Sequence, residues 1–331
     1  YVTKKNNIFG VSSYMPFEKL GSLSTLEDRF FSVYANAAYT YDDRYSVTVS
    51  FRTDASNFQA EDVRDKFSPF WSFGASWLIS NERFMERASW IDQLKLRASY
   101  GIAGVAAGKS GTSSVTTVAV HPGSLIYSGG ESFNTIAERG NNTLTWEKSR
   151  TLNIGVDMAF FGHKLSGSAE FYNKYSYDVL ANTTVPVISQ GVESMLLNNA
   201  EIVNRGVEFS IGSDLPVAVD LSWSGVLNYS YNHNELKKFG YSGPYMAVGN
   251  SYVVGRPIGS YSVLKPAGYS PEGYVLLGGK DGSREPILDE ESSHMMDFVT
   301  PREGQTLDDN NWAYYLGAAE PKSTLSFSNM F

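Results

Sequence analysis

Hydrophobic and polar residues alternate with a period of two along much of the chain. Between residues 31 and 41, Phe, Val, Ala and Tyr occupy the odd positions, and mostly Ser, Asn and Thr occupy the even ones. The alternation resumes at 45–52, after the short polar segment 42–44. Since successive side chains of a strand point to opposite faces, this pattern predicts a β-hairpin with one apolar and one polar face.

The same period returns in seven further segments, which gives nine predicted strands. Six of these segments alternate clearly, namely 71–79, 94–100, 152–160, 165–172, 207–211 and 221–231. The seventh, at 323–331, is weaker. The sequence therefore predicts an all-β fold.

The predicted connections alternate between short and long. The short ones are 42–44, 161–164 and 213–220, the segment 80–93 is of middling length, and the long ones are 54–69, 102–145, 176–202 and 232–320. An up-and-down membrane barrel has short turns on one side of the membrane and long loops on the other. The pattern favours an antiparallel transmembrane β-barrel, with 232–320 as a long extracellular loop region.

The charged residues of the predicted strands share a face with Ser and Thr. In an outer-membrane barrel this face lines the wet interior, because an Arg or Lys facing lipid at mid-depth would cost about 2–4 kcal/mol. Six residues are therefore predicted to face the lumen and to contact a plug or a substrate: Arg52, Lys95, Arg97, Asp157, Glu170 and Glu208. Aromatic girdles are predicted near the short turns (Tyr39, Tyr41, Tyr45, Phe160, Phe161) and near the long loops (Tyr100, Tyr229, Tyr231).

A soluble antiparallel sheet with one buried face gives the same alternation. Loop lengths and strand lengths favour the membrane barrel over that fold. The alternative function is that of a secreted β-sandwich that binds glycans, which predicts folding in buffer without detergent. A passive porin is a third class, and it predicts conductance without a plug or an energy source. Because open sheet edges do not occur in lipid, we expect the nine strands to form part of a larger barrel.

Composition narrows the function classes further. The 331 residues include 27 Lys and Arg against 35 Asp and Glu, a net charge of −8 that disfavours binding to a nucleic-acid backbone. The chain has no cysteine, and its four histidines are far apart in sequence. No apolar run has the length of a membrane-spanning helix. The first residues lack the apolar core of a signal peptide, so we expect a protein that stays where it is made or an internal piece of a longer one.

Signals for catalysis or metal binding are sparse. Asp281 and Ser283, with the acidic segment 289–291 and Asp297, offer clustered oxygens for Ca²⁺ in an extracellular loop, although the spacing is not that of an EF-hand and a solvated acidic loop is the simpler interpretation. Glu147 and Asp157 would lie roughly 33 Å apart on one strand, too far for a glycosidase pair. We therefore expect neither an enzyme nor a resident cofactor.

Aromatic side chains in the long connections are the better candidates for recognition. A tyrosine offers an apolar ring and a polar tip, so it can stack on a sugar or pack against a protein partner. The candidates for contact with a substrate or a partner are Tyr127, Phe133, Tyr241, Tyr245, Tyr252 and Tyr261, and Tyr269 and Tyr274 also punctuate these segments. Packing of the loops onto one another is an equal interpretation of these residues.

Several motifs, taken in their order along the chain, resemble a known family. The first half contains Arg52–Phe58, Phe67–Ser72, Trp77, Asn81–Met85 and Leu94–Gly101. The second half contains Leu144–Glu147, Asn153–Asp157, Phe171–Tyr172, Asn198–Glu208, Gly255–Tyr261 and Leu316–Pro321. This order and spacing resembles the barrel of the SusC/RagA-type TonB-dependent transporters of Bacteroidetes over most of residues 29–331. Ala55 and Ala200 replace expected glycines, and 281–311 do not match the usual Asp-rich loop.

The resemblance implies a 22-stranded barrel in the outer membrane of a Gram-negative bacterium. It also implies a plug domain through which TonB acts, and a SusD-type surface lipoprotein that caps the extracellular mouth. On this interpretation residues 1–331 are part of one barrel domain, and the plug and the ends of the barrel are absent from this sequence. The expected function is the uptake of a nutrient, either a glycan or a peptide, and the partners are the lipoprotein, TonB and outer-membrane lipid.

Overall fold

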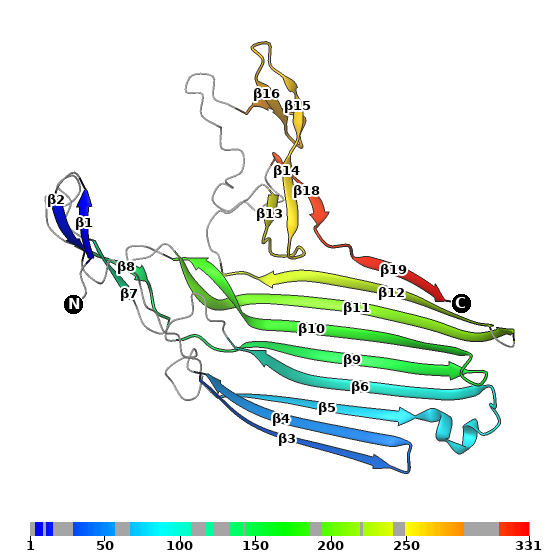
Figure 1. The fold of residues 1–331 in the computed structure, drawn as a ribbon. Coiled ribbons are helices and arrows are strands. Elements are labelled where there is room, and N and C mark those ends of the chain that lie inside the picture. Colours follow the sequence, from blue (N-terminus) through cyan, green and yellow to red (C-terminus); the bar gives the residue numbers. More distant parts are fainter. Residues whose placement is uncertain are drawn as a thin grey trace.

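The computed structural model describes residues 4–8, 11–15, 29–56, 67–106, 117–121, 133–141, 143–185, 194–218, 221–240, 249–287 and 311–330. Its main body is one antiparallel sheet of nine strands (Figure 1). In spatial order these are β19 (Ser323–Met330), β12 (Leu221–Lys238), β11 (Ser194–Ala218), β10 (Leu165–Thr184), β9 (Glu147–Phe160), β6 (Ile91–Val105), β5 (Ser68–Leu78), β4 (Tyr45–Ser56) and β3 (Phe30–Tyr41). The sheet contains all nine segments in which hydrophobic and polar residues alternate.

Smaller elements occupy the connections. Two hairpins pair β1 (Lys4–Ile8) with β2 (Val11–Met15) and β7 (Thr117–His121) with β8 (Phe133–Glu138). Beyond the β12 side of the sheet stand two three-stranded sheets (Figure 1), made of β13 (Gly249–Ser251), β14 (Ser260–Leu264) and β18 (Ala313–Ala318), and of β15 (Pro266–Tyr269), β16 (Val275–Gly278) and β17 (Arg284–Pro286). Two 3₁₀ turns, η2 (Ile79–Asn81) and η3 (Arg83–Met85), join β5 to β6. In the described part of the chain, no helix has the length and apolar character needed to cross a membrane.

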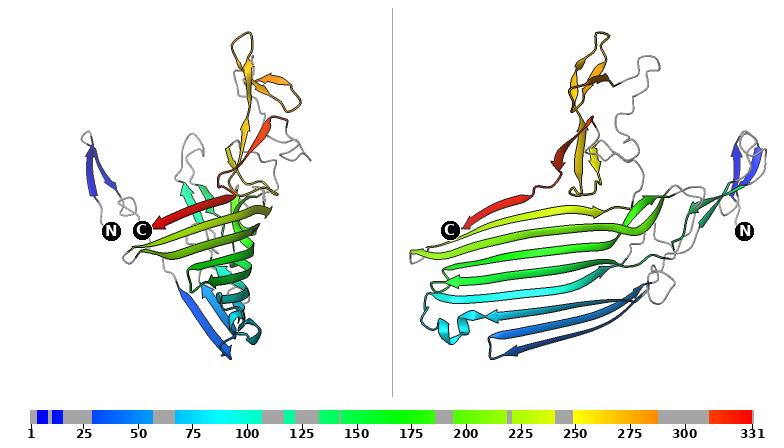
Figure 2. Two further views of the ribbon diagram at one scale, coloured as in Figure 1. Left: turned by 90° about the vertical axis from the view of Figure 1, so that its right-hand side faces the viewer. Right: turned by 180° about the vertical axis from the view of Figure 1, so that it is seen from behind.

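The connections between strands lie alternately at the two ends of the sheet. The connections after β3, β5, β9 and β11 all lie at one end, and those after β4, β6, β10 and β12 lie at the other (Figures 1 and 2). At the first end the β3–β4 turn is tight, because Asp42 and Asp43 both have positive φ and Arg44 N–H donates to the carbonyl of Tyr41. That geometry matches the twist of the flanking strands. The three shortest connections, 42–44, 161–164 and 219–220, all lie at this end, although 79–90 at the same end is longer than 57–67 and 185–193 at the other.

The register keeps the two faces of the sheet chemically distinct. Residues that pair directly across antiparallel strands share a face, and one such row runs through Ala37, Val49, Phe73, Tyr100 and Leu152 on β3, β4, β5, β6 and β9. The apolar face is open, since Val49 and Phe73 are 47% and 46% exposed. No second sheet covers this face among the described residues, whereas a β-sandwich would bury it.

The strands are longer than the alternation predicts. The predicted connection 176–202 is mostly strand, because β10 runs to Thr184 and β11 begins at Ser194. The connections 213–220 and 102–145 also shrink, since β11 reaches Ala218 and β6 reaches Val105. The extensions of β10 and β11 carry polar residues on both faces, and that of β6, residues 102–105, has no polar side chain, so none shows the alternation that marks the rest of each strand. The predicted loop region 232–320 likewise contains the end of β12 and the strands β13–β18.

Aromatic side chains gather at the short-turn end of the sheet. Tyr45 stacks on Trp77 with ring centroids 6.3 Å apart, and Trp90 stacks on Phe160 and Phe161 at 5.6 and 6.1 Å. Tyr39 and Tyr41 are 67% and 61% exposed on the same end. This arrangement matches the girdle predicted near the short turns.

Candidate functional site

The polar face of the sheet carries all six residues that were predicted to line a lumen. Along the register one row joins Lys95, Asp157 and Ser168, and the next joins Arg97, Gly155, Glu170 and Glu208. Five of the six residues therefore lie in two adjacent rows on β6, β9, β10 and β11. Arg52, on β4, is the sixth and lies apart from them.

Arg97 is the centre of an ion cluster that crosses three strands. Its Nε lies 3.1 Å from Asp157 Oδ2 on β9, and its Nη1 donates to Glu170 Oε1 on β10 at 2.6 Å. Gly155 pairs with Arg97 on one side and with Glu170 on the other, and a Cβ added there would come within 2.8 Å of the Arg97 guanidinium carbon. The absence of a side chain at Gly155 lets the guanidinium lie across β9 and reach both carboxylates. The sequence placed these residues on one face but could not show that they touch.

Glu208 and Lys95 flank this cluster without joining it. Glu208 pairs directly opposite Glu170, so two carboxylates face each other across β10 and β11. Within the part of the chain that the structure describes, neither Glu208 nor Lys95 forms an ion pair. The charge of Arg97 is therefore neutralised by two acids, and the carboxylate of Glu208 lies beside them on the polar face of the sheet.

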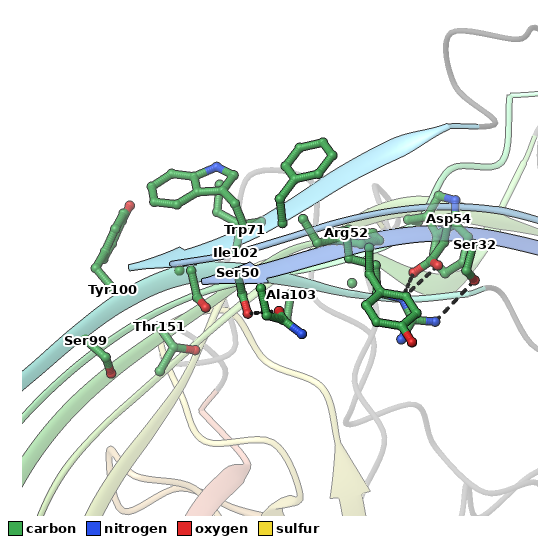
Figure 3. A pocket seen from close by; sticks show the side chains of 18 of the residues that line it. Ser32, Ser50, Arg52, Asp54, Trp71, Ser99, Tyr100, Ile102, Ala103 and Thr151 are labelled. Carbon is green, nitrogen blue, oxygen red and sulfur yellow. Dashed lines mark hydrogen bonds and ion pairs between the residues drawn. The ribbon is translucent and has the colours of Figure 1, made fainter. Parts of the chain in front are cut away.

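Arg52 belongs to a second polar group near the long connections. Its Nε donates to both carboxylate oxygens of Asp54 at 2.7 Å, and its Nη2 lies 3.3 Å from Ser32 Oγ (Figure 3). Ser50 donates to Asn36 at 2.6 Å in the adjoining row. Asp54 is buried, while Arg52 stays exposed. The arrangement is a row of amide, hydroxyl and charged groups on β3 and β4.

A hollow of about 750 Å³ adjoins this group, where β5 and β6 separate. Its lining includes Arg52, Ser99 and Thr151 on the polar side, and Figure 3 shows Trp71 and Tyr100 on the opposite side of the sheet. The last pair between β5 and β6 is Trp71 with Ile102, beyond which β6 continues beside β9 while β5 stays with β4. The hollow is therefore a consequence of the divergence of two strands.

A small apolar cluster closes the hollow at its far end. Phe70 and Trp146 pack edge to face, with ring centroids 5.5 Å apart, and both are buried, as is Leu144. Gly104 makes room for Phe70, because a Cβ there would lie 2.1 Å from the ring. Sequence reasoning missed this cluster. The only signal was a glycine in a strand facing large aromatics, which marks a close approach.

The loop aromatics are described only in part. Tyr252 is 55% exposed and stacks on Phe239 at 5.4 Å, and Tyr261 is 40% exposed on β14. Phe133 begins β8, where its backbone pairs with His121. Three of the predicted residues lie outside the described residues: Tyr127, Tyr241 and Tyr245. Between the described rings of Tyr252 and Tyr261 there is no ring contact, and the role of these aromatics in recognition stays a prediction.

Of the acidic group predicted to hold Ca²⁺, only Asp281 and Ser283 are described. Its carboxylate accepts bonds from the Ser283 N–H, the Ser283 hydroxyl and the Asn311 amide, at 2.9, 2.5 and 2.8 Å. These donors lower the pKa of Asp281 from 3.8 to about 2. The segment 289–291 and Asp297 lie outside the described residues, and among those described no three acidic or histidine side chains gather to hold a metal ion. The predicted Ca²⁺ site stays untested.

Glu82 ties together the short-turn end of the sheet. It accepts hydrogen bonds from Tyr45 at 2.5 Å and from the Trp77 indole at 3.0 Å, and Arg44 lies 3.4 Å away. The bonds from Tyr45 and Trp77 hold the pKa of the Glu82 carboxyl below its usual range. The segment 81–85 is one of the motifs that resemble the family, but the sequence predicted no role for Glu82. In the structure, Glu82 anchors the 3₁₀ turns to β4 and β5 through its bonds to Tyr45 and Trp77.

A family model and the curated relatives that match this chain point to the same family of proteins. Residues 2–279 match the family described as TonB dependent receptor-like, beta-barrel. The chain is 32% identical over 215 residues to TonB-dependent receptor P3 of Formosa agariphila, covering 64% of this chain and 21% of that protein. It is 28% identical over 209 residues to TonB-dependent receptor SusC of Bacteroides thetaiotaomicron, covering 62% of this chain and 21% of that protein.

Among solved structures, the RagAB peptide transporter has the same fold. The TM-score is 0.68 at 24% identity, and the match covers 91% of this chain and 31% of that one. The chain therefore spans about a fifth of the length of the curated relatives that it matches and about a third of the matched structure.

Proposed function

Because the chain belongs to the TonB-dependent receptor-like β-barrel family, we propose that it forms nine neighbouring strands in the wall of an outer-membrane nutrient importer. One observation carries this proposal. The sheet has an uncovered apolar face and a polar face, and its three shortest connections lie at one end. A strand wall between lipid and an aqueous lumen needs these properties together.

The dimensions of the apolar face suit a membrane. On β9 the apolar positions run from Leu152 to Phe160, a length of about 26 Å along the strand. A barrel strand is tilted by about 35–45°, so this stripe covers most of an apolar band about 25 Å tall. The two edge strands, β3 and β19, each have one unpaired side in the described chain. In lipid those edges need partner strands, which fits a larger barrel.

On this proposal the polar face lines the transport path. Arg97 with Asp157 and Glu170 forms a fixed ion cluster, and Glu208 and Lys95 beside it present charges to whatever fills the lumen. These groups would contact the plug or the substrate. Arg52 and the hollow near the long connections would serve the same role closer to the mouth.

The cargo we propose is a glycan or a peptide, delivered with the help of a SusD-type surface lipoprotein. The similarity to SusC and the shared fold with the RagAB peptide transporter support this choice. The long connections, with exposed Tyr252 and Tyr261, would form the extracellular mouth. Energy would come from TonB through a plug region, and the protein would reside in the outer membrane of a Gram-negative bacterium.

Fractionation and uptake assays on the full polypeptide that contains this chain test the proposal. We expect a heat-resistant species in the outer-membrane fraction that co-purifies with a lipoprotein. We also expect glycan or peptide uptake that stops when the inner-membrane proton gradient is collapsed. Uptake that continues without the gradient would indicate a passive porin. A species that is stable in buffer without detergent would indicate the β-sandwich instead, and would refute the proposal.

A further inference from the structure

Toward the long connections, polar and basic residues enter the apolar face of the sheet. On β9 and β12 the last apolar residues are Leu152 and Tyr231, whereas on β10 and β11 Phe171 and Val207 are followed, after one polar residue, by Tyr175 and Val203. The next residues on the same face are Arg150, Asn173, Arg205 and His233. Three of these four can carry positive charge. These three residues, Arg150, Arg205 and His233, form a basic border of the apolar stripe on β9, β11 and β12.

Two cations in this border have no acidic partner among the described residues. The acids on this part of the sheet are each engaged, since Asp178 lies 3.3 Å from Lys148, Glu235 lies 2.6 Å from Lys237, and Glu201 lies 3.6 Å from Lys238. His233 also approaches Glu235, at 3.7 Å. Arg150 and Arg205 are exposed, and neither forms an ion pair or a hydrogen bond through its side chain within the described ranges.

Arg150 is held in place by aromatic rings. Its guanidinium carbon lies 4.8 Å from the Tyr177 ring centroid and 5.6 Å from that of Tyr175. A cation over ring faces keeps its N–H groups free to donate at the edge of the guanidinium. Arg205 lies two strands away and one register row lower, so the two Cα atoms are about 12 Å apart. Two long Arg side chains can converge on one anion across that distance.

We propose that Arg150 and Arg205 bind the phosphate-bearing headgroup of an outer-leaflet lipid. The inference rests on the membrane placement given above and extends it to a specific lipid contact. Guanidinium groups match phosphate oxygens in geometry and charge. Both arginines project from the lipid-facing side at the level where the apolar stripe ends, which is where headgroups lie.

Binding of lipid A, a phosphorylated glycolipid, tests this site. The full polypeptide is purified in non-ionic detergent, and lipid A binding is followed by native mass spectrometry. We expect the Arg150→Gln/Arg205→Gln double variant to bind lipid A about 30-fold more weakly, and each single variant about fivefold more weakly. Lipid A from which the phosphates have been removed should bind the unchanged protein about as weakly as intact lipid A binds the double variant.

Lys174→Gln is the matched control. Lys174 lies on β10 at nearly the same level but on the polar face, where it pairs with Thr151 and Asn204, and its loss should leave lipid A binding unchanged. If the double variant does not fold, the single variants and the charge-retaining Arg150→Lys/Arg205→Lys variant carry the test, and the latter should retain most of the binding. Equal binding by all variants, or displacement of lipid A by millimolar inorganic phosphate, would overturn the site. If the unchanged protein is also recovered in the outer-membrane fraction, such a failure concerns the lipid site alone and leaves the proposed membrane placement standing.

Discussion

Removal of the Arg97 side chain is the most direct test of the ion cluster. Arg97→Gln shortens the side chain but keeps a polar end group, and it leaves Asp157 and Glu170 without their cation. Glu170 would then face Glu208 across the β10–β11 pair without its ion-pair partner. We expect the folded wall to lose stability and this patch of the lumen to become strongly acidic.

The size of the effect follows from the contacts and their exposure. The side chains of Arg97, Asp157 and Glu170 are 35%, 32% and 23% exposed, so solvent screens both pairs. An exposed pair couples by about 0.2–1 kcal/mol, whereas a hydrogen bond to a charged group contributes about 1.5–3 kcal/mol when better shielded. We expect the 2.6 Å contact to Glu170 to have a coupling free energy of about 1 kcal/mol, between these two ranges. The longer contact to Asp157 should contribute somewhat less.

A double-mutant cycle measures this coupling. Arg97→Gln, Glu170→Gln and the combined variant are made in the full polypeptide, and the free energy of unfolding is measured in urea with detergent or lipid present. We expect a coupling of about 1 kcal/mol at low salt, which shrinks when ionic strength rises from about 0.1 to 1 M because the screening length falls from about 10 to 3 Å.

Lys95→Gln provides the control for charge removal. Lys95 lies on the same strand and face as Arg97 and forms no ion pair among the described residues, so its loss should change stability by less than about 0.5 kcal/mol. A coupling near zero, or an equal loss of stability in Lys95→Gln, would refute the reasoning. Arg97 would then be only a solvated charge on the face.

Three further predictions concern other parts of the chain. Gly104→Ala should lower stability by about 1–3 kcal/mol, measured by urea unfolding, because its Cβ would press on Phe70; unchanged stability would mean that the ring moves freely. Glu82→Gln should speed tryptic cleavage between β5 and β6, because a neutral amide holds its two donors more weakly; an unchanged rate would argue against the anchor. Since the pKa of Asp281 falls to about 2, its bonds stabilise the turn above about pH 4 and are lost as pH drops toward 2; carboxyl NMR titration with Asp281→Asn as reference should find a midpoint near 2, not near 4.

Alternation was enough to predict the main sheet, and the reason is physical. Each strand separates two different environments, so a segment such as 45–52 must place Val and Phe on one face and Ser and Thr on the other. Where both environments are aqueous the constraint vanishes. The outer parts of β10 and β11, up to Thr184 and from Ser194, were therefore interpreted as a loop although their backbones pair.

The shared face of the six charged residues could be predicted, but their contacts could not. Parity places Arg97, Asp157 and Glu170 on one side, whereas their meeting depends on the register of three strands and on the gap left by Gly155. The hollow beside Arg52 depends on the point at which β5 and β6 separate. No local pattern encodes either relation, since pairing between distant segments sets both.

The insertion between β12 and β19 bears on the order in which the wall assembles. Three pairs of neighbouring strands are joined by turns of a few residues, but β19 reaches β12 only after residues 239–322. That connection is about three doublings longer than 185–193, so closing it as a flexible chain would cost about 2 kcal/mol more in chain entropy.

Pairing within the insertion removes much of that cost in advance. β14 pairs with β18, which brings Ser260 next to Ala318, and backbone hydrogen bonds join Leu236 to Gly255 and to Arg256. Once these contacts form, only short flexible segments separate the end of β12 from the start of β19. We therefore expect the insertion to fold first and to deliver β19 to its neighbour as the last strand of this sheet.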